Sequence, residues 1–340
     1  MRLAPSAEQA AFAGALHDAL AATPSPGWGV LAAAGVTGLA VPERFGGAGA
    51  SAADLVVAAE ELGHHAVAGP VAESIAAVPV LLAGCGDEQG AAKWLPELAA
   101  GRLVASLAAP PWLPFAADGD SAGLVLLVDR DVVRLGRGGY AYPSMDSTRR
   151  IAEISPGSVV AEGPALVPVV ERALNLGALV CAAQLLGLGR ALLEASVRYA
   201  RTREQFGGPI GRFQAVQHRL ADVAVGLEFA RPLLYAAAAA LESGLSGGSA
   251  GLSGGSGGLS GGSGGLSGGS GGRDVSAAKV ACGEAAQRAA RAALQVHGAI
   301  GYTREHGLDR WLTKARVLAL SWGTPAQHRA RVMTELARGR

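Results

Sequence analysis

The sequence predicts a mainly α fold in three parts: an N-terminal all-helical domain (1–102), a small, reduced β middle domain (103–166) and a C-terminal helical bundle (167–340). Two observations support this prediction. Apolar residues recur at helical spacing through the first part and again from about residue 168. Between these stretches, short segments rich in Val, Leu and Ile are separated by Pro, Gly and Asp, which is typical of strands.

The N-terminal part contains clear helix boundaries. A first helix is expected over 6–23, where Ser6 and Gln9 can form a capping box and the Pro-rich stretch 24–27 ends the run. The glycine-rich stretch 42–49 is expected to be a loop, because Gly and Pro both break helices. Further helices are expected over 28–34, 51–63, 71–83 and 89–100.

The remaining chain first changes to strands and then returns to helices. Strands are expected over 103–108, 123–129, 131–135 and 151–154. Long helices are expected over 168–201, 213–244, 275–297, 307–320 and 325–337. Between the second and third of these helices lies a repeat of Leu-Ser-Gly-Gly-Ser-Gly-Gly over 245–272. A glycine unit with one leucine buries almost nothing, so this segment is expected to be a disordered Gly/Ser linker.

Composition excludes several classes of function. A net charge of +1 without a basic stripe excludes nucleic-acid binding. The longest apolar run, 173–189, is interrupted by Asn175 and Gln184, so no membrane span is expected. Without a visible secretory signal the expected location is cytoplasmic. The three cysteines lack metal spacing. We expect His64 and His65 at the surface, because no carboxylate or Cys accompanies them at metal spacing, so no metal is predicted.

One segment between two expected helices combines features of a phosphate site. Residues 201–210 read Arg-Thr-Arg-Glu-Gln-Phe-Gly-Gly-Pro-Ile. Arginine offers forked donors to a phosphate, and glycine lets the backbone approach closely. A helix turn with solvated arginines is the alternative interpretation of the same residues.

Longer strings resemble the acyl-CoA dehydrogenase family. Residues 201–222 (RTREQFGGPIGRFQAVQHRLAD) are similar to a helix–turn–helix signature of that family, and 295–306 (QVHGAIGYTREH) resembles its Gln-x-x-Gly-Gly-x-Gly-Tyr segment. The stretches Val41–Gly49, Glu60–Gly63 and Leu98–Gly101 are similar to its N-terminal domain. The resemblance spans nearly the whole chain apart from the repeat.

The resemblance implies an FAD site shared at a subunit interface. Carried over by motif position, five residues would contact the pyrophosphate and adenine side of a neighbour's flavin: Arg203, Phe206, Gln214, Gln295 and Gly298. Thr324 belongs to the Gly-Thr pair that follows the usual base position and joins the cofactor-binding set.

The chain departs from the family where the catalytic base is expected. The family's glutamate precedes Gly-Thr, but here Trp322 stands there, and indole has no basic nitrogen near neutral pH. At the alternative base position, 26 residues before Arg203, stands Gly177, and Glu171 is an outside candidate almost two turns away. The flavin-covering loop is replaced by 108–114, and the family's Arg-Asp-Ala by Thr313-Lys314-Ala315. No catalytic residue is therefore assigned.

These losses resemble the shortened, non-catalytic subunit of heterotetrameric (α2β2) acyl-CoA dehydrogenases. The expected partners are a homologous full-length subunit, an acyl-CoA substrate such as a bulky steroid side chain, and an electron-transferring flavoprotein. Two alternatives stay open. One is a homotetrameric dehydrogenase whose base lies elsewhere, at Glu171 or a histidine such as His297. The other is an acyl-CoA-binding structural or regulatory relative without redox activity.

Overall fold

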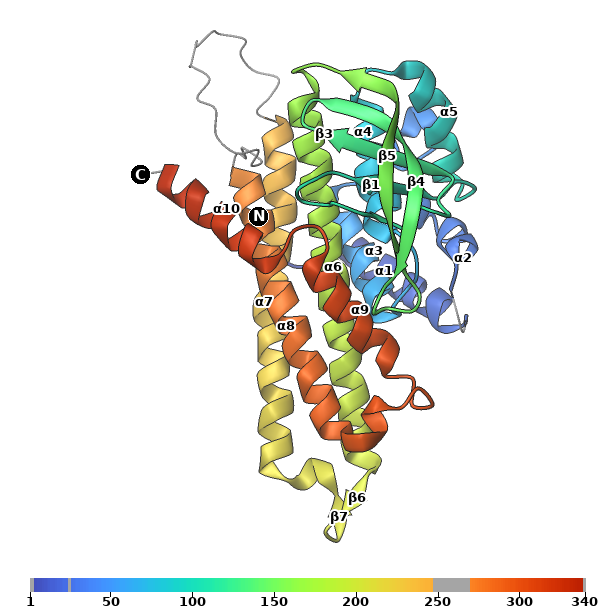
Figure 1. Ribbon diagram of the computed structural model, residues 1–340. Coiled ribbons are helices and arrows are strands. Elements are labelled where there is room, and N and C mark those ends of the chain that lie inside the picture. The colour runs from blue at the N-terminus through green and yellow to red at the C-terminus, as the bar shows by residue number, and fades with distance from the viewer. Residues whose placement is uncertain (1–2, 24–25, 247–269, 339–340) are drawn as a thin grey trace.

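The structure is a computed structural model, and it describes residues 3–23, 26–246 and 270–338. Figure 1 shows a long helical bundle, with the sheet and the N-terminal helices gathered along one half of its length. The predicted mainly α fold, with N-terminal helices, a central sheet and a C-terminal helical bundle, is confirmed. The 245–272 linker prediction falls largely outside the described residues, and the structure extends helices over its first two and last three residues.

The N-terminal helices begin where the sequence places caps. Ser6 and Gln9 form a capping box before α1, and Ser51 and Asp54 form one before α3, so that both boundaries were predictable. The segment Glu73–Ala77 is a π-helical turn, which helical periodicity alone did not indicate. The elements of this part are α1 (Ala7–Ala21), α2 (Trp28–Ala33), η1 (Val36–Gly38), η2 (Glu43–Phe45), α3 (Ala52–His64), η3 (Glu73–Ala77), α4 (Val78–Gly84) and α5 (Glu88–Ala99).

The middle part is a five-stranded sheet in the order β1-β3-β4-β5-β2. Its first pair, β1 and β3, is parallel, and the other pairs are antiparallel. The predicted strands over 131–135 and 151–154 are too short, because glycines interrupt the apolar pattern of the two strands that form there. Gly136 is required there, since a Cβ would collide with Ile154 on the paired strand. The strands are β1 (Ala105–Ala108), β2 (Ala116–Ala117), β3 (Leu124–Asp129), β4 (Val132–Pro143) and β5 (Arg150–Glu162).

The C-terminal helices surround α6 (Leu166–Thr202), which is the central helix of the molecule. It is long and apolar enough to cross a membrane, but 89% of its apolar window is buried, as in the core helix of a folded domain. The helix α7 (Gln214–Ser246) also meets this criterion, with 39% of its window buried. The remaining elements are β6 (Glu204–Gln205), β7 (Gly208–Pro209), η4 (Ile210–Arg212), α8 (Ser270–His297), η5 (Gly298–Tyr302), α9 (Asp309–Leu320) and α10 (Pro325–Arg338).

Two glycines let α6 lie directly against α3. A methyl group on Gly187 would collide with the backbone of Glu60, and one on Gly63 would collide with the backbone of Gln184. The two helices therefore cross at backbone contact, which fixes the N-terminal helices on the bundle. At the other end of the bundle, the β6–β7 hairpin projects beyond α6 and α7 (Figure 1).

Candidate functional site

The first candidate site surrounds Trp322, in the turn that joins α9 to α10. Trp322 has a φ of 57° and the following Gly323 a φ of 89°, so that the backbone reverses sharply. This turn directs the indole into the protein, where the residue is 4% exposed. The ring packs on Gly177 of α6, at which any side chain would overlap it. The two positions at which a catalytic glutamate was sought are therefore in contact, and one indole fills the space of both.

This contact predicts the effect of enlarging Gly177. We expect Gly177→Ala to lower the free energy of unfolding by about 1–3 kcal/mol relative to a matched change, Gly283→Ala, because overpacking forces neighbouring groups to shift. Gly283 is the control because it also lies in a helix, yet a Cβ there would meet only Leu185 at 3.9 Å. Denaturant unfolding of both variants measures the difference. Equal stabilities of the two variants would show that the packing of the Trp322 ring does not require glycine at position 177.

Little open space remains beside the indole. One cavity of about 10 Å³ is lined by Trp112, Leu174, Asn175, Ala178, Trp322, His328 and Arg331. A second, of about 20 Å³, lies between the N-terminal helices, the sheet and α9. A volume of this size holds about one water molecule. Neither cavity has room for an acyl thioester or a flavin ring.

His328, the imidazole nearest to Trp322, is fully occupied by hydrogen bonds. Its Nε2 lies 2.8 Å from the carbonyl oxygen of Trp322 and therefore donates, whereas its Nδ1 lies 3.0 Å from Oγ of Ser276 and accepts. Burial is the largest cause that lowers the pKa of His328 to about 4, so that the ring is neutral at physiological pH. Its role is to hold the turn rather than to exchange protons.

A buried carboxyl group that the sequence did not single out lies on the other side of the indole. Glu73, in the π-helical turn, is 3% exposed, and burial raises its pKa, while Arg149 and a hydrogen bond from Trp322 oppose this rise. The one available signal was a single acidic residue within the apolar run 71–83. The adjacent cavity of about 20 Å³ leaves Glu73 no room to meet a substrate carbon.

A buried ion pair connects the sheet to α9 near this site. Nζ of Lys314 lies 2.7 Å from Oδ2 of Asp146, and the two side chains are 5% and 2% exposed. The partner of Asp146 is thus Lys314, and not Arg149 or Arg150, which follow it closely in the sequence. Arg149 donates to Oγ of Ser321, and Arg150 pairs with Asp120. The altered Thr-Lys-Ala segment thus has a structural role.

The other two candidate bases lie away from Trp322. Glu171 is six residues before Gly177, which corresponds to about 9 Å along a helix axis. It is half-buried and interacts electrostatically with Arg331. His297 stacks on Tyr199 with ring centroids 4.4 Å apart. Because Tyr199 follows Gly177 by 22 residues of α6, His297 lies about 33 Å along the helix from the indole. A role of His297 as a base elsewhere in the chain stays a prediction.

The second candidate site is the hairpin end of the bundle, which we define as Arg203, Phe206, Gln214, Gln295 and Gly298. Arg203 is the C-cap of α6, Phe206 lies in the β6–β7 hairpin, and Gln214 begins α7. The stacking of Tyr199 on His297 holds the last turn of α6 against the last turn of α8. The five residues predicted to contact a flavin therefore lie at one end of the molecule (Figure 1).

The hairpin end faces outward. All five residues are exposed, and the Phe206 ring is 85% exposed at a φ of 52°. An arginine in a glycine-containing turn can bind a diphosphate, and an exposed aromatic ring beside it can stack on a planar base. Both groups would belong to a ligand that another molecule holds. Thr324 lies apart from this group, next to Trp322, where its hydroxyl accepts from the backbone N–H of Gln327 and caps α10. A cofactor role for all six residues stays a prediction.

A larger cavity separates the N-terminal helices from α6 and α7. Its volume is about 320 Å³, within the range of small-molecule sites. Most of its lining is apolar, with Arg172 and Glu242 as the charged residues. Glu242 accepts from the backbone N–H of Ala52 at 2.8 Å, so that this carboxylate closes the N-terminus of α3.

Comparisons with known proteins agree with this arrangement. The sequence model of the acyl-CoA dehydrogenase C-terminal domain matches residues 167–337, and that of the acyl-CoA dehydrogenase N-terminal domain matches residues 2–102. The acyl-CoA dehydrogenase IpdE2 of Mycolicibacterium smegmatis is 29% identical over 304 residues, which cover 89% of this chain and 85% of that protein.

Solved structures share the fold. The ChsE4–ChsE5 complex from Mycobacterium tuberculosis contains a chain that matches with a TM-score of 0.80 and 22% identity, over 99% of both chains. A chain of a steroid ACAD matches with a TM-score of 0.77 and 22% identity, over 98% of both chains.

Proposed function

The chain belongs to the acyl-CoA dehydrogenase family, and from this premise we propose that it is a subunit without its own catalytic base, which completes the FAD site of a longer partner subunit. One observation carries the proposal. The residues of the flavin motifs are exposed at the hairpin end, while Trp322 fills the chain's own base position. The chain thus retains the hairpin end, which would contact a neighbour's flavin, whereas the indole of Trp322 fills the place of its own catalytic base.

Dehydrogenation of an acyl thioester requires two groups with different roles. FAD, when bound, accepts the β-hydrogen as hydride, and a base removes the α-proton. At the hairpin end, the guanidinium of Arg203 would neutralise the diphosphate, and Phe206 and Gln214 would hold the adenine side. Near Trp322 the indole cannot accept a proton, so that proton removal falls to the partner subunit.

An exposed apolar face on α7 supports association with another chain. Val225, Phe229 and Leu233 are spaced four residues apart and therefore share one face of the helix. They are 52%, 76% and 45% exposed. Such a stripe is unfavourable in water and suits a subunit interface.

The family membership also suggests a substrate class and an electron acceptor. We propose a CoA thioester with a bulky acyl group, such as a steroid side chain, and an electron-transferring flavoprotein as the acceptor. The cavity of about 320 Å³ beside α6 is the place at which this chain would contact part of an acyl chain. A similar fold occurs in a steroid ACAD and in the two-chain ChsE4–ChsE5 complex, which supports this choice.

Co-expression tests the proposal. The chain purified alone should lack flavin and show no dehydrogenase activity. Co-expressed with a homologous full-length subunit, it should form a yellow complex that a CoA thioester bleaches. A yellow homotetramer of this chain alone that is bleached by a CoA thioester would overturn the proposal. A colourless chain that binds acyl-CoA but never assembles with a longer subunit would favour a structural or regulatory relative.

A variant within the complex tests the role of the hairpin end. Arg203→Ala should weaken FAD retention about tenfold or more, because it removes charge-assisted hydrogen bonds to the diphosphate. Arg198→Ala is the matched control, since Arg198 lies on the same helix and its side chain is 72% exposed. Gel filtration with absorbance of bound flavin measures retention. Equal flavin content in the two variants would exclude Arg203 from the site.

A further inference from the structure

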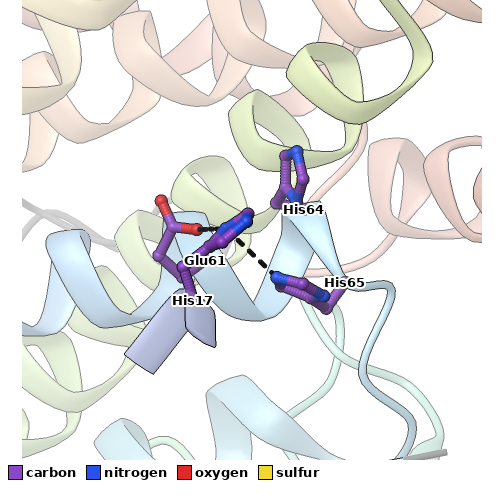
Figure 2. Close-up of side chains that lie close together, drawn as sticks. All are labelled: His17, Glu61, His64 and His65. Atoms are coloured by element: carbon purple, nitrogen blue, oxygen red, sulfur yellow. Dashed lines mark hydrogen bonds and ion pairs between the residues drawn. The ribbon is translucent and has the colours of Figure 1, made fainter. Parts of the chain in front are cut away.

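Three of the seven histidines gather with a buried glutamate on the N-terminal side of the bundle. His17 lies on α1, Glu61 and His64 lie on α3, and His65 is the C-cap of α3. Nδ1 of His17 is 2.9 Å from Oε2 of Glu61 and 3.2 Å from Nε2 of His65. One ligand atom from each of the four residues lies within 4.8 Å of the others. Figure 2 shows His17 between Glu61 and His65, with His64 beside them.

From the sequence alone, His64 and His65 are expected at the surface, because no carboxylate or Cys accompanies them at metal spacing. The structure corrects this view. Glu61 precedes His64 and His65 by three and four residues, which brings all three to one face of the helix end. The fourth ligand, His17, arrives from another helix, which local spacing cannot reveal. The side chain of His64 is only 12% exposed.

Two features of the cluster are unexplained by hydrogen bonding among the described residues. Nδ1 of His64 is buried without a hydrogen-bond partner in the part of the chain that the structure describes. Its Nε2 lies 2.9 Å from Oε2 of Glu194, and a carboxylate on one ring nitrogen leaves the other as a lone-pair donor, as in metal-binding histidines. In addition, both Glu61 and His65 face Nδ1 of His17, which can carry only one proton.

We propose that His17, Glu61, His64 and His65 bind a divalent transition-metal ion of the zinc class. Three imidazoles and one carboxylate form a four-ligand set that Zn²⁺ accepts in tetrahedral geometry. With metal–nitrogen bonds of about 2.0–2.1 Å, the ligand atoms would be about 3.3 Å apart. Two of the separations in the structure, 2.9 and 3.2 Å, are close to this value, and all four ligand atoms lie within 4.8 Å of one another.

The charges around the cluster permit a cation. Arg190 pairs with Oε1 of Glu61 at 2.9 Å, so that Oε2, which faces His17, stays available. Glu60 pairs with Arg190 and Arg231, and Glu228 also pairs with Arg231, so that two carboxylates face these two cations. The ligands also surround the C-terminus of α3, where the helix dipole favours positive charge.

The site would connect elements that are far apart in the sequence. It joins α1 to the end of α3, and Glu194 and Trp311 link it to α6 and α9, since Nε1 of Trp311 donates to the His64 carbonyl at 2.8 Å. It shares no residue with the Trp322 pocket or with the hairpin end. The inference therefore goes beyond the proposed dehydrogenase role and concerns how the N-terminal helices are held on the bundle.

Metal titration of the untagged chain tests the inference. The chain is freed of metal with a chelator and titrated with Co²⁺, whose visible absorption bands reveal tetrahedral coordination. We expect saturation at a single equivalent, displacement of Co²⁺ by Zn²⁺, and a higher Tm with Zn²⁺. Absence of saturable binding by the folded chain would overturn the inference.

Variants locate the bound ion. We expect His17→Gln to abolish saturable binding and Glu194→Gln to weaken it about 10–100-fold, because the second acts by orienting His64. The control is His218→Gln, an exposed histidine on α7 that should bind as the wild type does. Circular dichroism checks the fold, and Glu194→Gln should preserve it because that side chain is 46% exposed. Unchanged affinity in His17→Gln would refute the site.

Discussion

The variant Lys314→Met is expected to lower the free energy of unfolding by about 3–5 kcal/mol, because it leaves the buried Asp146 carboxylate without its counter-ion. Both side chains are almost fully buried and lie 2.7 Å apart. Lys279→Met is the matched control. Lys279 is also buried, but it donates to the Leu318 carbonyl at 3.0 Å, and no carboxylate pairs with it among the described residues. Losing such a hydrogen bond costs about 0.5–1.5 kcal/mol.

The pH dependence of stability separates this mechanism from a packing defect. Burial raises the pKa of Asp146, but Lys314 and hydrogen bonds from Lys314 and Thr148 outweigh it and hold the pKa below its usual value. The contribution of the pair is therefore complete above the unfolded pKa of about 3.9 and is lost as the pH falls through the lower folded pKa. In Lys314→Met the Asp146 carboxyl should protonate more readily, so that acid no longer weakens this site. Denaturant midpoints across this range test the difference, and a parallel decline in both proteins would contradict it.

The second large effect is expected for Trp322→Ala, with a loss of about 3–5 kcal/mol, because the indole is buried and nothing else fills its space. Gly177 has no side chain that could move into the cavity, and Glu73 would lose the hydrogen bond that the indole provides. Trp322→Phe, which keeps an aromatic ring, should cost less than the alanine variant. Thermal and denaturant unfolding measure both. A loss below about 1 kcal/mol for Trp322→Ala would mean that the indole does not support the core.

Local chemistry made much of the fold predictable. Ser6 and Ser51 cap their helices within one turn, so that these boundaries depend on residues that lie three positions apart. The lengths of β4 and β5 were underestimated, because a glycine such as Gly136 makes room for side chains of neighbouring strands. The sequence of one strand does not contain that requirement.

The candidate sites were predictable only in part, for a similar reason. The motif positions at the hairpin end lie close to the ends of consecutive helices, so that their common location follows from the helical pattern. The contact of Trp322 with Gly177, and that of Lys314 with Asp146, join residues more than a hundred positions apart. Glu73 and His17 gain their importance from such distant neighbours, which periodicity and spacing do not encode.

The length of α7 has a practical consequence for the Gly/Ser repeat that follows it in the sequence. From Gln214 to Ser246 the helix rises about 48 Å, so that its last turn and the first turn of α8 lie far from the hairpin end. Chain added between these turns is remote from any flavin that Arg203 could reach. We therefore expect that a reporter domain could be fused there while assembly at the opposite end is observed.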